Sequence, residues 1–303
     1  MNDGEHGREY LKKLKLLYVE DDSETRSSIE RILLHHVGTL ITACNGAEGA
    51  EVFHSQRPEI VITDILMPVM DGLTMAQEIR AVDRHVPIIV ISAFEQYDYL
   101  LRAIDIGVTK FVTKPVISGP LIAALTECAH RLYAEERLRH LALYDALTDL
   151  PNRTLLKERL DMACSVADRN SEQVALLFLD LDNFKIINDS YGHLCGDLVL
   201  QELAQRMRTM FRSCDTVCRL SGDEFLVVIT GVFNLDDVIS AVKKLIGLLS
   251  QEIVISGTVL KVTPSIGIAL YPDNGTDMDA LIRSADSAMY RVKQQGGCGF
   301  MLY

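Results

Sequence analysis

The N-terminal part of the chain alternates short apolar runs with longer amphipathic stretches. Each run is rich in β-branched residues and is bounded by polar or glycine-containing segments. Strand-length runs separated by helix-length segments predict an α/β domain with a doubly wound, five-stranded parallel sheet. We expect this domain over residues 12–119, after a flexible leader at 1–11. The expected strands are Leu14–Val19, Thr39–Ala43, Ile60–Thr63, Ile88–Ile91 and Phe111–Thr113.

A long helical stretch follows and is expected to connect two domains over residues 120–144. Apolar positions along its first half keep a spacing of roughly 3.5 residues, which fits a short dimeric coiled coil. The same spacing fits a last helix that packs on its own domain. The pattern alone favours neither alternative. The apolar positions are Leu121, Leu125, Cys128 and Leu132.

A second alternating pattern fills residues 145–303. Two of its apolar runs flank Ser221–Glu224 so closely that this segment is interpreted as the tip of a β-hairpin. Paired strands of this kind predict an α/β domain with a mixed or antiparallel sheet, unlike the first domain. The expected strands are Val174–Leu179, Thr216–Leu220, Phe225–Ile229, Ile253–Ile255 and Val262–Ala269.

Composition narrows the range of partners. The net charge of −12 disfavours a DNA partner, because phosphate contacts need a basic surface. The apolar runs are too short to span a bilayer, and the polar N-terminus lacks the apolar core of a signal peptide, so we expect a cytoplasmic protein with no membrane partner. The seven cysteines follow no metal-binding or disulfide pattern and are expected to be reduced.

The first domain is predicted to gather polar residues where its strands end. Glu20 and Asp21 follow the first strand, and Asp64 follows the third. In open α/β sheets ligands bind at the carboxyl ends of strands, and converging carboxylates need a hard cation such as Mg²⁺ between them. A carboxylate beside that cation can attack a phosphoryl group, with Ser92 and Lys114 holding the new phosphate oxygens. Taken singly, each residue would be a solvated strand end; their coincidence at one edge favours a site.

These stretches resemble the response regulator receiver family. The resemblance rests on Leu-Tyr-Val-Glu-Asp-Asp at 17–22, Asp-Ile-Leu-Met-Pro-Val-Met-Asp-Gly at 64–72 and Phe-Val-Thr-Lys-Pro at 111–115. It implies that a histidine kinase phosphorylates Asp64 and that Lys114 precedes a cis proline. It also implies Mg²⁺ ligands at Glu20, Asp21, Asp64 and the Leu66 carbonyl. The receiver switch would consist of Ser92, Phe111 and Lys114.

The second domain places two carboxylates where phosphoryl-transfer chemistry needs them. Asp180 closes an apolar strand, and Asp223 lies on the hairpin tip, an arrangement that suits two metal ions. Between them, Asn188, His193 and Asp197 are candidates for a base pocket, and a carboxylate such as Asp197 suits the N1–H and N2–H edge of guanine. Alternatively, Asn188 and Asp197 are ordinary helix caps.

Residues from about 144 to the end resemble the GGDEF family of diguanylate cyclases. The resemblance rests on Asp-Ala-Leu-Thr-Asp-Leu-Pro-Asn-Arg at 145–153, the polar segment at 180–197, Ser-Gly-Asp-Glu-Phe at 221–225, Ser-Ile-Gly-Ile-Ala at 265–269 and Ala-Asp-Ser-Ala-Met-Tyr-Arg-Val-Lys at 285–293. It implies condensation of two GTP molecules into cyclic di-GMP by a homodimer, with Mg²⁺, or Mn²⁺ in its place, as cofactor. The implied catalytic residues are Asp180, Asp223 and Glu224.

The same resemblance assigns the remaining roles. The metal would be held by Asp180, the Leu181 carbonyl, Asp223 and Glu224, and the substrate by Asn188, His193, Asp197 and Lys293. The R-x-x-D segment of Arg212 and Asp215 matches the family's product-inhibition site in spacing; an ordinary surface ion pair is the alternative.

Three positions depart from the family pattern, one of them Cys298, where asparagine is frequent. Ser221 replaces the usual first glycine, which would cost about 1 kcal/mol if that position required a positive φ. Gly297 stands where many members carry an arginine. We therefore expect a phosphorylation-regulated, product-inhibited diguanylate cyclase, with a catalytically weak cyclic di-GMP-binding module as the alternative.

Overall fold

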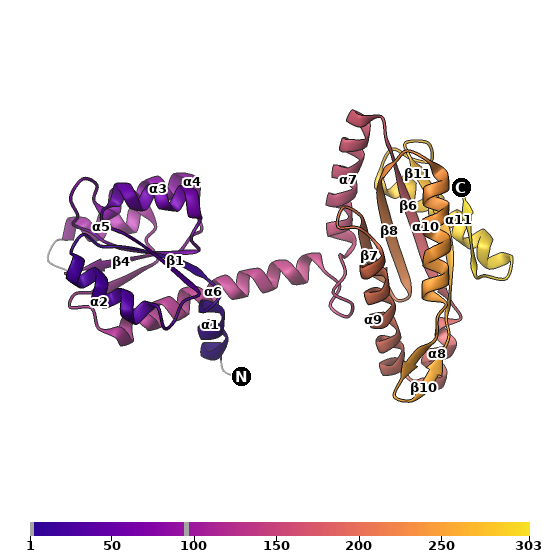
Figure 1. Cartoon of the computed structure of the whole chain (residues 1–303), viewed down its shortest axis with the longest axis horizontal. Coiled ribbons are helices and arrows are strands. Elements are labelled where there is room, and N and C mark those ends of the chain that lie inside the picture. The colour runs from indigo at the N-terminus through magenta and orange to yellow at the C-terminus, as the bar shows by residue number, and fades with distance from the viewer. Residues whose placement is uncertain (1–2, 94–96) are drawn as a thin grey trace. The chain divides into compact units, whose positions relative to one another are not determined.

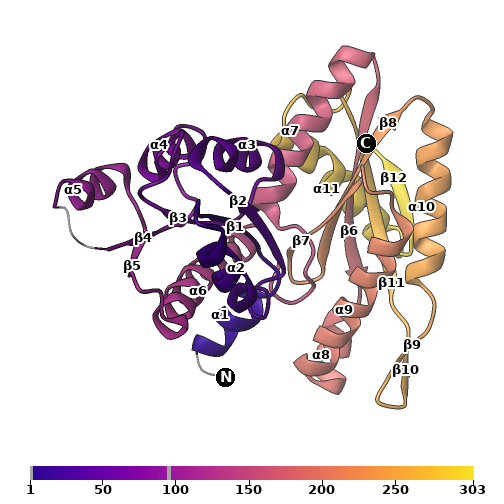
Figure 2. The same cartoon turned by 60° about the vertical axis from the view of Figure 1, so that its left-hand side comes forward.

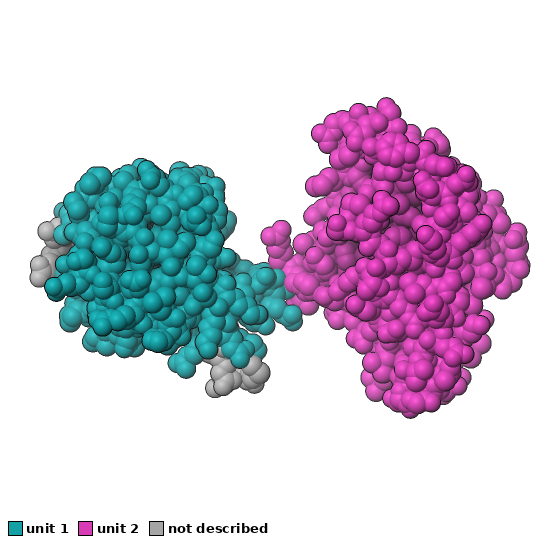
Figure 3. Space-filling view, viewed as in Figure 1, with its two compact units in different colours: residues 1–138 teal, residues 139–303 magenta. Residues whose placement is uncertain are grey.

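The computed structural model describes residues 3–93 and 97–303. By its internal contacts the chain divides into two compact units, residues 1–138 and 139–303 (Figure 1, Figure 3). In the part of the chain that is described, no helix combines the length and apolar character needed to cross a membrane.

The first unit is built on a parallel sheet of five strands in the order β2-β1-β3-β4-β5. All pairings between its neighbouring strands are parallel, which confirms the doubly wound sheet predicted from the apolar runs. All carboxyl ends therefore meet at one edge. The strands are β1 (Lys15–Val19), β2 (Thr39–Ala43), β3 (Ile60–Asp64), β4 (Ile88–Ser92) and β5 (Lys110–Thr113).

Helices cover both faces of this sheet because its side chains alternate between two apolar cores. Leu16 and Tyr18 of β1 face α1 (Asp3–Leu11), α2 (Ser23–Leu33) and α6 (Ser118–Leu143). Leu17 and Val19 face α3 (Gly46–Gln56), α4 (Gly72–Val82) and α5 (Tyr97–Ile106). Burial on both faces explains why the strands are continuous apolar runs.

The flexible leader expected at residues 1–11 is wrong for Asp3–Leu11, which form helix α1. Leu11 at the end of this helix is 1% exposed and belongs to the core. The rings of Tyr10 and Tyr133 lie 5.4 Å apart, so α1 packs on α6. The polar composition of the segment concealed this packing.

The regularly spaced apolar residues of helix α6 pack on their own domain, which is one of the two alternatives that the sequence left open. Leu121, Leu125 and Cys128 are buried in the core of the first unit, and Leu132 packs against the same core. These positions therefore serve their own domain instead of a coiled coil. Beyond them the helix is largely exposed, with Leu138 and Leu141 at 66% and 54% exposure.

The second unit contains a five-stranded mixed sheet in the order β12-β11-β6-β8-β7. β11 and β12 pair in parallel and the other neighbours pair antiparallel, as predicted for this domain. A separate hairpin joins β9 (Ile253–Ile255) to β10 (Thr258–Leu260). The sheet strands are β6 (Gln173–Asp182), β7 (Thr216–Ser221), β8 (Glu224–Val232), β11 (Thr263–Tyr271) and β12 (Gly299–Leu302).

Helices again cover the two faces of this sheet (Figure 2). α7 (Arg153–Asn170) and α11 (Met278–Gln294) pack on one face. α9 (His193–Met210) and α10 (Leu235–Leu249) pack on the other, together with the buried side of the short α8 (Phe184–Tyr191). α8 and α9 thus follow directly on the end of β6, where Asp180 lies.

Candidate functional site

The first candidate site lies at the carboxyl edge of the parallel sheet. Glu20, which is 1% exposed, follows β1, and Asp64 ends β3. One carboxylate oxygen from each of Glu20, Asp21 and Asp64 lies within 4.8 Å of the other two. The structure therefore brings together the three predicted acidic residues, and their all-oxygen donor set suits Mg²⁺.

A lysine already balances part of this charge. Lys114 Nζ lies 2.6 Å from Asp64 Oδ2 and 3.4 Å from Glu20 Oε2. Burial raises the pKa of Glu20, and the nearby charge of Asp64 raises it further. Burial alone would lower the pKa of Lys114, but its contacts with Asp64 and Glu20 outweigh this and raise it. A second cation at this edge would relieve the remaining repulsion.

The predicted switch residues surround the same carboxylate. Asp64, Leu66, Ser92 and Lys114 line a cavity of about 150 Å³. Phe111 lies on β5 and is half-buried against the core on the α3–α5 face. The Lys114–Pro115 bond is cis, as the family resemblance implied.

The second candidate site is built by antiparallel strands. Asp180 of β6 lies directly opposite Glu224, the first residue of β8, and Asp223 occupies the tip between β7 and β8. Gly222 has a φ of +53°, a left-handed conformation that glycine adopts without strain. Ser221 does not have a positive φ, so the backbone strain considered for a serine at this position is absent. Its hydroxyl donates a hydrogen bond to Glu224 Oε2 at 3.1 Å.

Lys293 of α11 completes this carboxylate group. Its Nζ lies 2.5 Å from Asp180 Oδ1 in an ion pair. Lys293 is thus the charged partner of this buried oxygen. Burial raises the pKa of Asp180, and the charges of Asp223 and Glu224 add to the rise, although Lys293 opposes it. One lysine therefore offsets only part of the charge of these three carboxylates, and a metal cation would stabilise Asp180 further.

The Leu181 carbonyl fits the same role. Leu181 pairs with Pro264 of β11, which has no backbone N–H to donate. On the other side, the pairing of β6 with β8 ends one residue earlier, at Asp180 and Glu224. The strand ladder thus supplies no N–H to this carbonyl at its register, and the predicted Mg²⁺ donor set of Asp180, Leu181 and Asp223 fits the residues present.

The helix-cap interpretation of Asn188 and Asp197 is wrong. Asn188 lies inside α8, and Asp197 lies in the second turn of α9, whose cap is Gly192. A Cβ atom at Gly196 would lie 2.0 Å from Asn188 Oδ1, so only glycine lets the asparagine keep this position. His193 begins α9 and is exposed. The three predicted base-pocket residues thus lie on adjoining helices that follow β6.

The ion-pair interpretation of Arg212 and Asp215 is also not supported. Asp215 accepts hydrogen bonds from the backbone N–H groups of Arg212 at 3.2 Å and Thr230 at 3.1 Å. The described part of the chain contains no ion pair between the two side chains, and Arg212 is exposed. Asp215 shapes the turn after α9 and leaves the arginine free for an anion.

Sequence reasoning missed the clamp on the hairpin. Arg219 Nη1 donates to Asp145 Oδ1 at 2.8 Å, and Nε and Nη2 of the same guanidinium donate to the Gly222 carbonyl at 2.9 and 2.8 Å. Thr148 donates to the same Asp145 oxygen through its backbone and its hydroxyl. The Asp-x-x-Thr turn after α6 therefore holds the tip that carries Asp223. The spacing of residues in that turn gave no sign of its partner.

A second missed residue is Asp182, two positions after Asp180 on the same strand. It accepts hydrogen bonds from the Thr263 and Ser265 hydroxyls and the Cys298 backbone N–H. Gly297 has a φ of +75°, and a Cβ there would lie 2.9 Å from the Asp182 carboxylate. This explains the departure at 297: the loop after α11 is drawn onto Asp182 and leaves no room for an arginine.

Comparison with known proteins identifies the family of each domain. The family model "Diguanylate cyclase, GGDEF domain" matches residues 142–298, and "Response regulator receiver domain" matches residues 16–126. The bifunctional diguanylate cyclase/cyclic di-GMP phosphodiesterase MucR of Pseudomonas aeruginosa is 45% identical over 170 residues, which is 56% of this chain and 25% of MucR. The response regulator PleD of Caulobacter vibrioides is 28% identical over 260 residues, which is 82% of this chain and 57% of PleD.

A solved structure of similar fold is the coiled coil and GGDEF domain of DgcB from Caulobacter crescentus in complex with c-di-GMP. It covers 61% of this chain and 97% of its own, with a TM-score of 0.55 and 25% identity. The chain spans about a quarter of the length of MucR and 57% of PleD. The GGDEF match covers more than half of the chain, and the chain belongs to the diguanylate cyclase GGDEF-domain family, with a response regulator receiver domain in front of the GGDEF domain.

Proposed function

We propose that this chain converts two GTP molecules into cyclic di-GMP and two pyrophosphates, as a homodimer controlled by phosphorylation of Asp64. The observation that carries the proposal is the convergence of Asp180, Glu224 and Lys293 beside the hairpin tip that bears Asp223. A catalytically inert relic would not need to keep a half-buried carboxylate with a raised pKa beside two further carboxylates at this position.

The residues have complementary parts in this reaction. Mg²⁺, or Mn²⁺, would be held by Asp180, the Leu181 carbonyl and Asp223 with Glu224 beside them, and would neutralise charge on the triphosphate. The Lys293 ammonium group lies where it can exchange its ion pair with Asp180 for one with a phosphate oxygen of the substrate.

The bond changes require two subunits. The 3′-hydroxyl of each GTP attacks the α-phosphate of the other, a new P–O bond forms, and the bond to pyrophosphate breaks. The hydroxyl proton leaves through the Asp223 carboxylate to water. Because each subunit positions one nucleotide, a single subunit cannot close the ring.

The base is recognised on the neighbouring helices. The Asp197 carboxylate accepts from the N1–H and N2–H groups of guanine, and the Asn188 amide reads an adjoining edge, while His193 helps to fix the nucleotide. Adenine has an acceptor at N1 and would leave Asp197 facing a lone pair. This selects GTP.

The receiver would control the cyclase through phosphorylation. A histidine kinase supplies the phosphoryl group to Asp64, where Lys114 and Ser92 hold its oxygens and Phe111 follows the serine. Helix α6 runs without a break to Leu143, and Asp145 begins the turn that clamps the hairpin. The product would inhibit the enzyme at Arg212 and Asp215, where the arginine reads the O6/N7 edge of guanine.

The test uses the purified full chain with GTP and Mg²⁺ and identifies the products by chromatography. We expect cyclic di-GMP and pyrophosphate, a higher rate with beryllofluoride, and a loss of at least about 100-fold in Asp223→Ala. An unchanged rate in Asp223→Ala would refute the assigned chemistry. Equal rates with and without beryllofluoride would refute the control by Asp64 phosphorylation but not the cyclase chemistry.

The second candidate function is a cyclic di-GMP-binding module with weak catalysis. Gly297 favours it, because its crowding against Asp182 removes the arginine that many relatives carry beside Lys293. Such a module would bind cyclic di-GMP at Arg212 yet form no product from GTP. The same incubation separates the two functions.

A further inference from the structure

Helix α1 crosses α6 at close range. A Cβ atom at Gly7 of α1 would lie 2.8 Å from the Thr126 carbonyl oxygen and 3.2 Å from the Cβ atom of His130. Any larger residue at this position would push the two helices apart. Glycine is a poor helix former, so its presence inside α1 is explained by this close crossing.

Aromatic side chains continue the contact along α6, beyond the receiver core. The ring of Tyr133 lies 5.4 Å from that of Tyr10 and is stacked on that of His6, with 5.7 Å between centroids and 12° between planes. Burial and the neighbouring Glu136 carboxylate raise the pKa of Tyr10 to about 12, so the phenol lies beside the next turn of α6. Among the described residues, Leu132 is the last one of α6 that packs against this core. Helix α1 therefore holds α6 for about one further turn.

Helix α1 is itself fixed to the sheet. The chain turns from Leu11 into β1 within three residues. In this turn the backbone N–H groups of Lys13 and Leu14 donate to the carbonyls of Tyr10 and Leu11 at 2.8 and 3.2 Å. Helix α1 thus joins the amino end of β1, at the edge opposite the one that carries Asp64. It is a fixed part of the first unit, from which it contacts α6.

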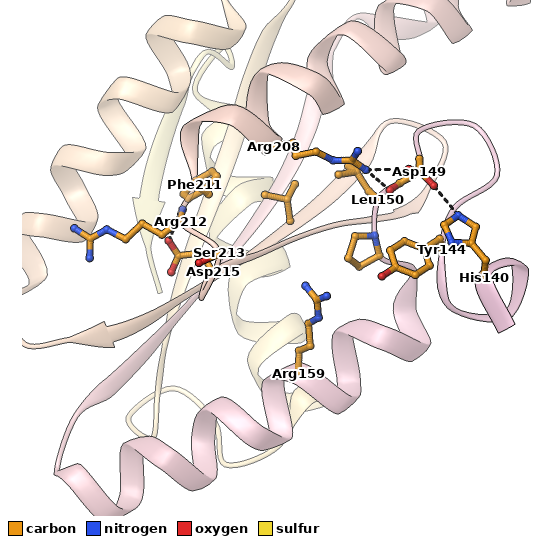
Figure 4. Close-up of a pocket in the computed structure, with 12 residues that line it drawn as sticks. His140, Tyr144, Asp149, Leu150, Arg159, Arg208, Phe211, Arg212, Ser213 and Asp215 are labelled. Carbon is orange, nitrogen blue, oxygen red and sulfur yellow. Dashed lines mark hydrogen bonds and ion pairs between the residues drawn. The ribbon is translucent and has the colours of Figure 1, made fainter. Parts of the chain in front are cut away.

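The end of α6 is held by residues of the second unit. His140 Nε2 lies 2.7 Å from the Asp149 carboxylate, which also contacts Arg208 at 3.5 Å (Figure 4). The Asn152 side chain donates to the Ala142 carbonyl at 2.8 Å. Each unit therefore holds its own part of one continuous helix.

The stretch of α6 between these two sets of contacts is short. Three residues, 137–139, separate Glu136 from His140. Without the contacts of α1 to Tyr133 and Glu136, the stretch would grow to seven residues, 133–139, or about two turns. A helical stretch of this length is marginal in water unless tertiary packing supports it.

The contact is not explained by the family of either domain. The matches to the receiver and GGDEF models cover residues 16–126 and 142–298. Tyr10, Tyr133 and Glu136 lie outside both ranges. The role of α1 therefore has to be inferred from the contacts that it makes in this chain.

We propose that α1 is a brace that couples the receiver to the cyclase, because it holds α6 as far as Glu136 and so allows a movement of the helix at the receiver to reach His140. The proposal rests on the proposed control by phosphorylation of Asp64 and names a contact on which that control depends. Loss of the brace would loosen α6 between the two units and leave both carboxylate sites intact.

The first test compares the rate of cyclic di-GMP formation by the full chain with and without beryllofluoride. Tyr133→Ala removes both ring contacts with α1 and is expected to lower the activation ratio toward one, by about 2- to 10-fold, the range for loss of an aromatic contact. The rate without beryllofluoride should not change, because both carboxylate sites keep all their residues. Tyr133→Phe keeps the ring contacts and should respond like wild type.

A second variant separates the brace from helix stability. Alanine forms helices better than glycine, but in Gly7→Ala the new Cβ must push α1 away from the Thr126 carbonyl. We expect a weaker response to beryllofluoride despite the better helix former. Gly119→Ala, on α6 itself, is the control: a Cβ there would meet no other segment of the described structure within 4 Å, and the response should equal that of wild type.

Hydrogen–deuterium exchange measures the brace without relying on cyclase activity. In Tyr133→Ala and Gly7→Ala, the backbone amides of residues 133–139 should exchange faster than in wild type, while those of the five receiver strands should not. The beryllofluoride concentration that gives half of each variant's activation should stay unchanged, because α1 joins the sheet at the edge opposite Asp64. Unchanged exchange at residues 133–139 in both variants would contradict the brace.

The outcomes separate this inference from the function on which it rests. If wild type is activated and both variants are activated to the same degree, the brace is wrong and control by Asp64 stands. If the variants reach the activated rate of wild type without beryllofluoride, α1 restrains the cyclase and the proposed coupling is wrong. If wild type does not respond to beryllofluoride, control by Asp64 and the brace both fail, while product formation still tests the cyclase. Gly7→Ala decides the question if Tyr133→Ala does not fold.

Discussion

The two carboxylate sites share one feature, an ion pair between a lysine and an aspartate, but different sheet topologies bring their residues together. In each, a lysine from later in the domain contacts a strand-end aspartate: Lys114 Nζ lies 2.6 Å from Asp64, and Lys293 Nζ lies 2.5 Å from Asp180. The parallel sheet brings Glu20, Asp21 and Asp64 within 4.8 Å through strand ends alone. The cyclase depends instead on a hairpin whose tip carries Asp223.

This difference in sheet topology indicates which parts of the chain can influence each site. An edge where every strand ends on the same side gathers its ligands as soon as the sheet forms. A hairpin tip must be held in place by something else, and here Arg219 holds it to the turn after α6. The cyclase site is therefore open to control from outside its own sheet, whereas the receiver site is complete in itself.

The largest expected effect comes from neutralising the two strand-end aspartates separately. Asp180→Asn should lower the rate of cyclic di-GMP formation by at least about 100-fold, because the amide cannot hold the cation at the reacting phosphates. Asp64→Asn should abolish the response to beryllofluoride. Product formation by each variant, with and without beryllofluoride, is the measurement.

The folded state of Asp180→Asn is its own control. Burial and the charges of Asp223 and Glu224 raise the pKa of Asp180, so the folded state disfavours its ionised form. Neutralising it should leave the unfolding temperature at or above that of wild type. A destabilised Asp180→Asn protein would mean that the lost activity reflects damage to the fold.

A smaller effect is expected from the clamp that distinguishes the hairpin site. Burial alone would raise the pKa of Asp145, but hydrogen bonds from Thr148 and Arg219 outweigh it and hold the pKa below its usual range. Asp145→Asn should cost about 1–3 kcal/mol of unfolding free energy at neutral pH and slow the cyclase. Urea unfolding at several pH values is the measurement.

The pH dependence of the stability difference between wild type and Asp145→Asn tests the direction of the Asp145 pKa shift. A depressed folded-state pKa adds stability that is fully present above the unfolded pKa near 4 and is lost as the pH falls through the folded value. The gap between wild type and Asp145→Asn should therefore be constant above about pH 5 and shrink toward about pH 3. A gap that widens in acid would contradict the clamp.

The smallest effect concerns the left-handed residue beside each site. At the cyclase tip it is Gly222, but beside the receiver site it is Val69, with a φ of +70° and 87% exposure. A β-branched residue is strained there, and its exposed side chain offers no packing in return. Val69→Gly should stabilise the first unit by about 0.5–1 kcal/mol in urea unfolding. Val69→Ala, which keeps most of the strain, is the control; equal stability of all three proteins would contradict the argument.

The sequence was sufficient for the sheets and for the acidic residues, because apolar runs and strand-end carboxylates are local signals. Each expected strand exists, and Asp64, Asp180 and Asp223 lie where the runs end. Asn188 and Asp197 show the limit of local reasoning. Their residue types are typical of helix caps, yet both lie inside helices.

What the sequence could not give depends on contacts between distant segments. Arg219 and Asp145 are 74 residues apart, and no periodicity links them. β12 is short and half-buried, and the loop before it is held by a hydrogen bond from the Cys298 backbone N–H to Asp182. Helix α1 has few apolar residues, and its packing on α6 follows from a tertiary contact with Tyr133.

The contact between Gly196 and Asn188 has a consequence for classifying related genes. A Cβ at position 196 would overlap the amide oxygen of Asn188, so any other amino acid there would displace the asparagine. A relative could then keep every acidic and amide residue of the motif and still have lost its preference among nucleotides. Glycine at this position is thus as informative a marker of the proposed guanine selectivity as the asparagine that it accommodates.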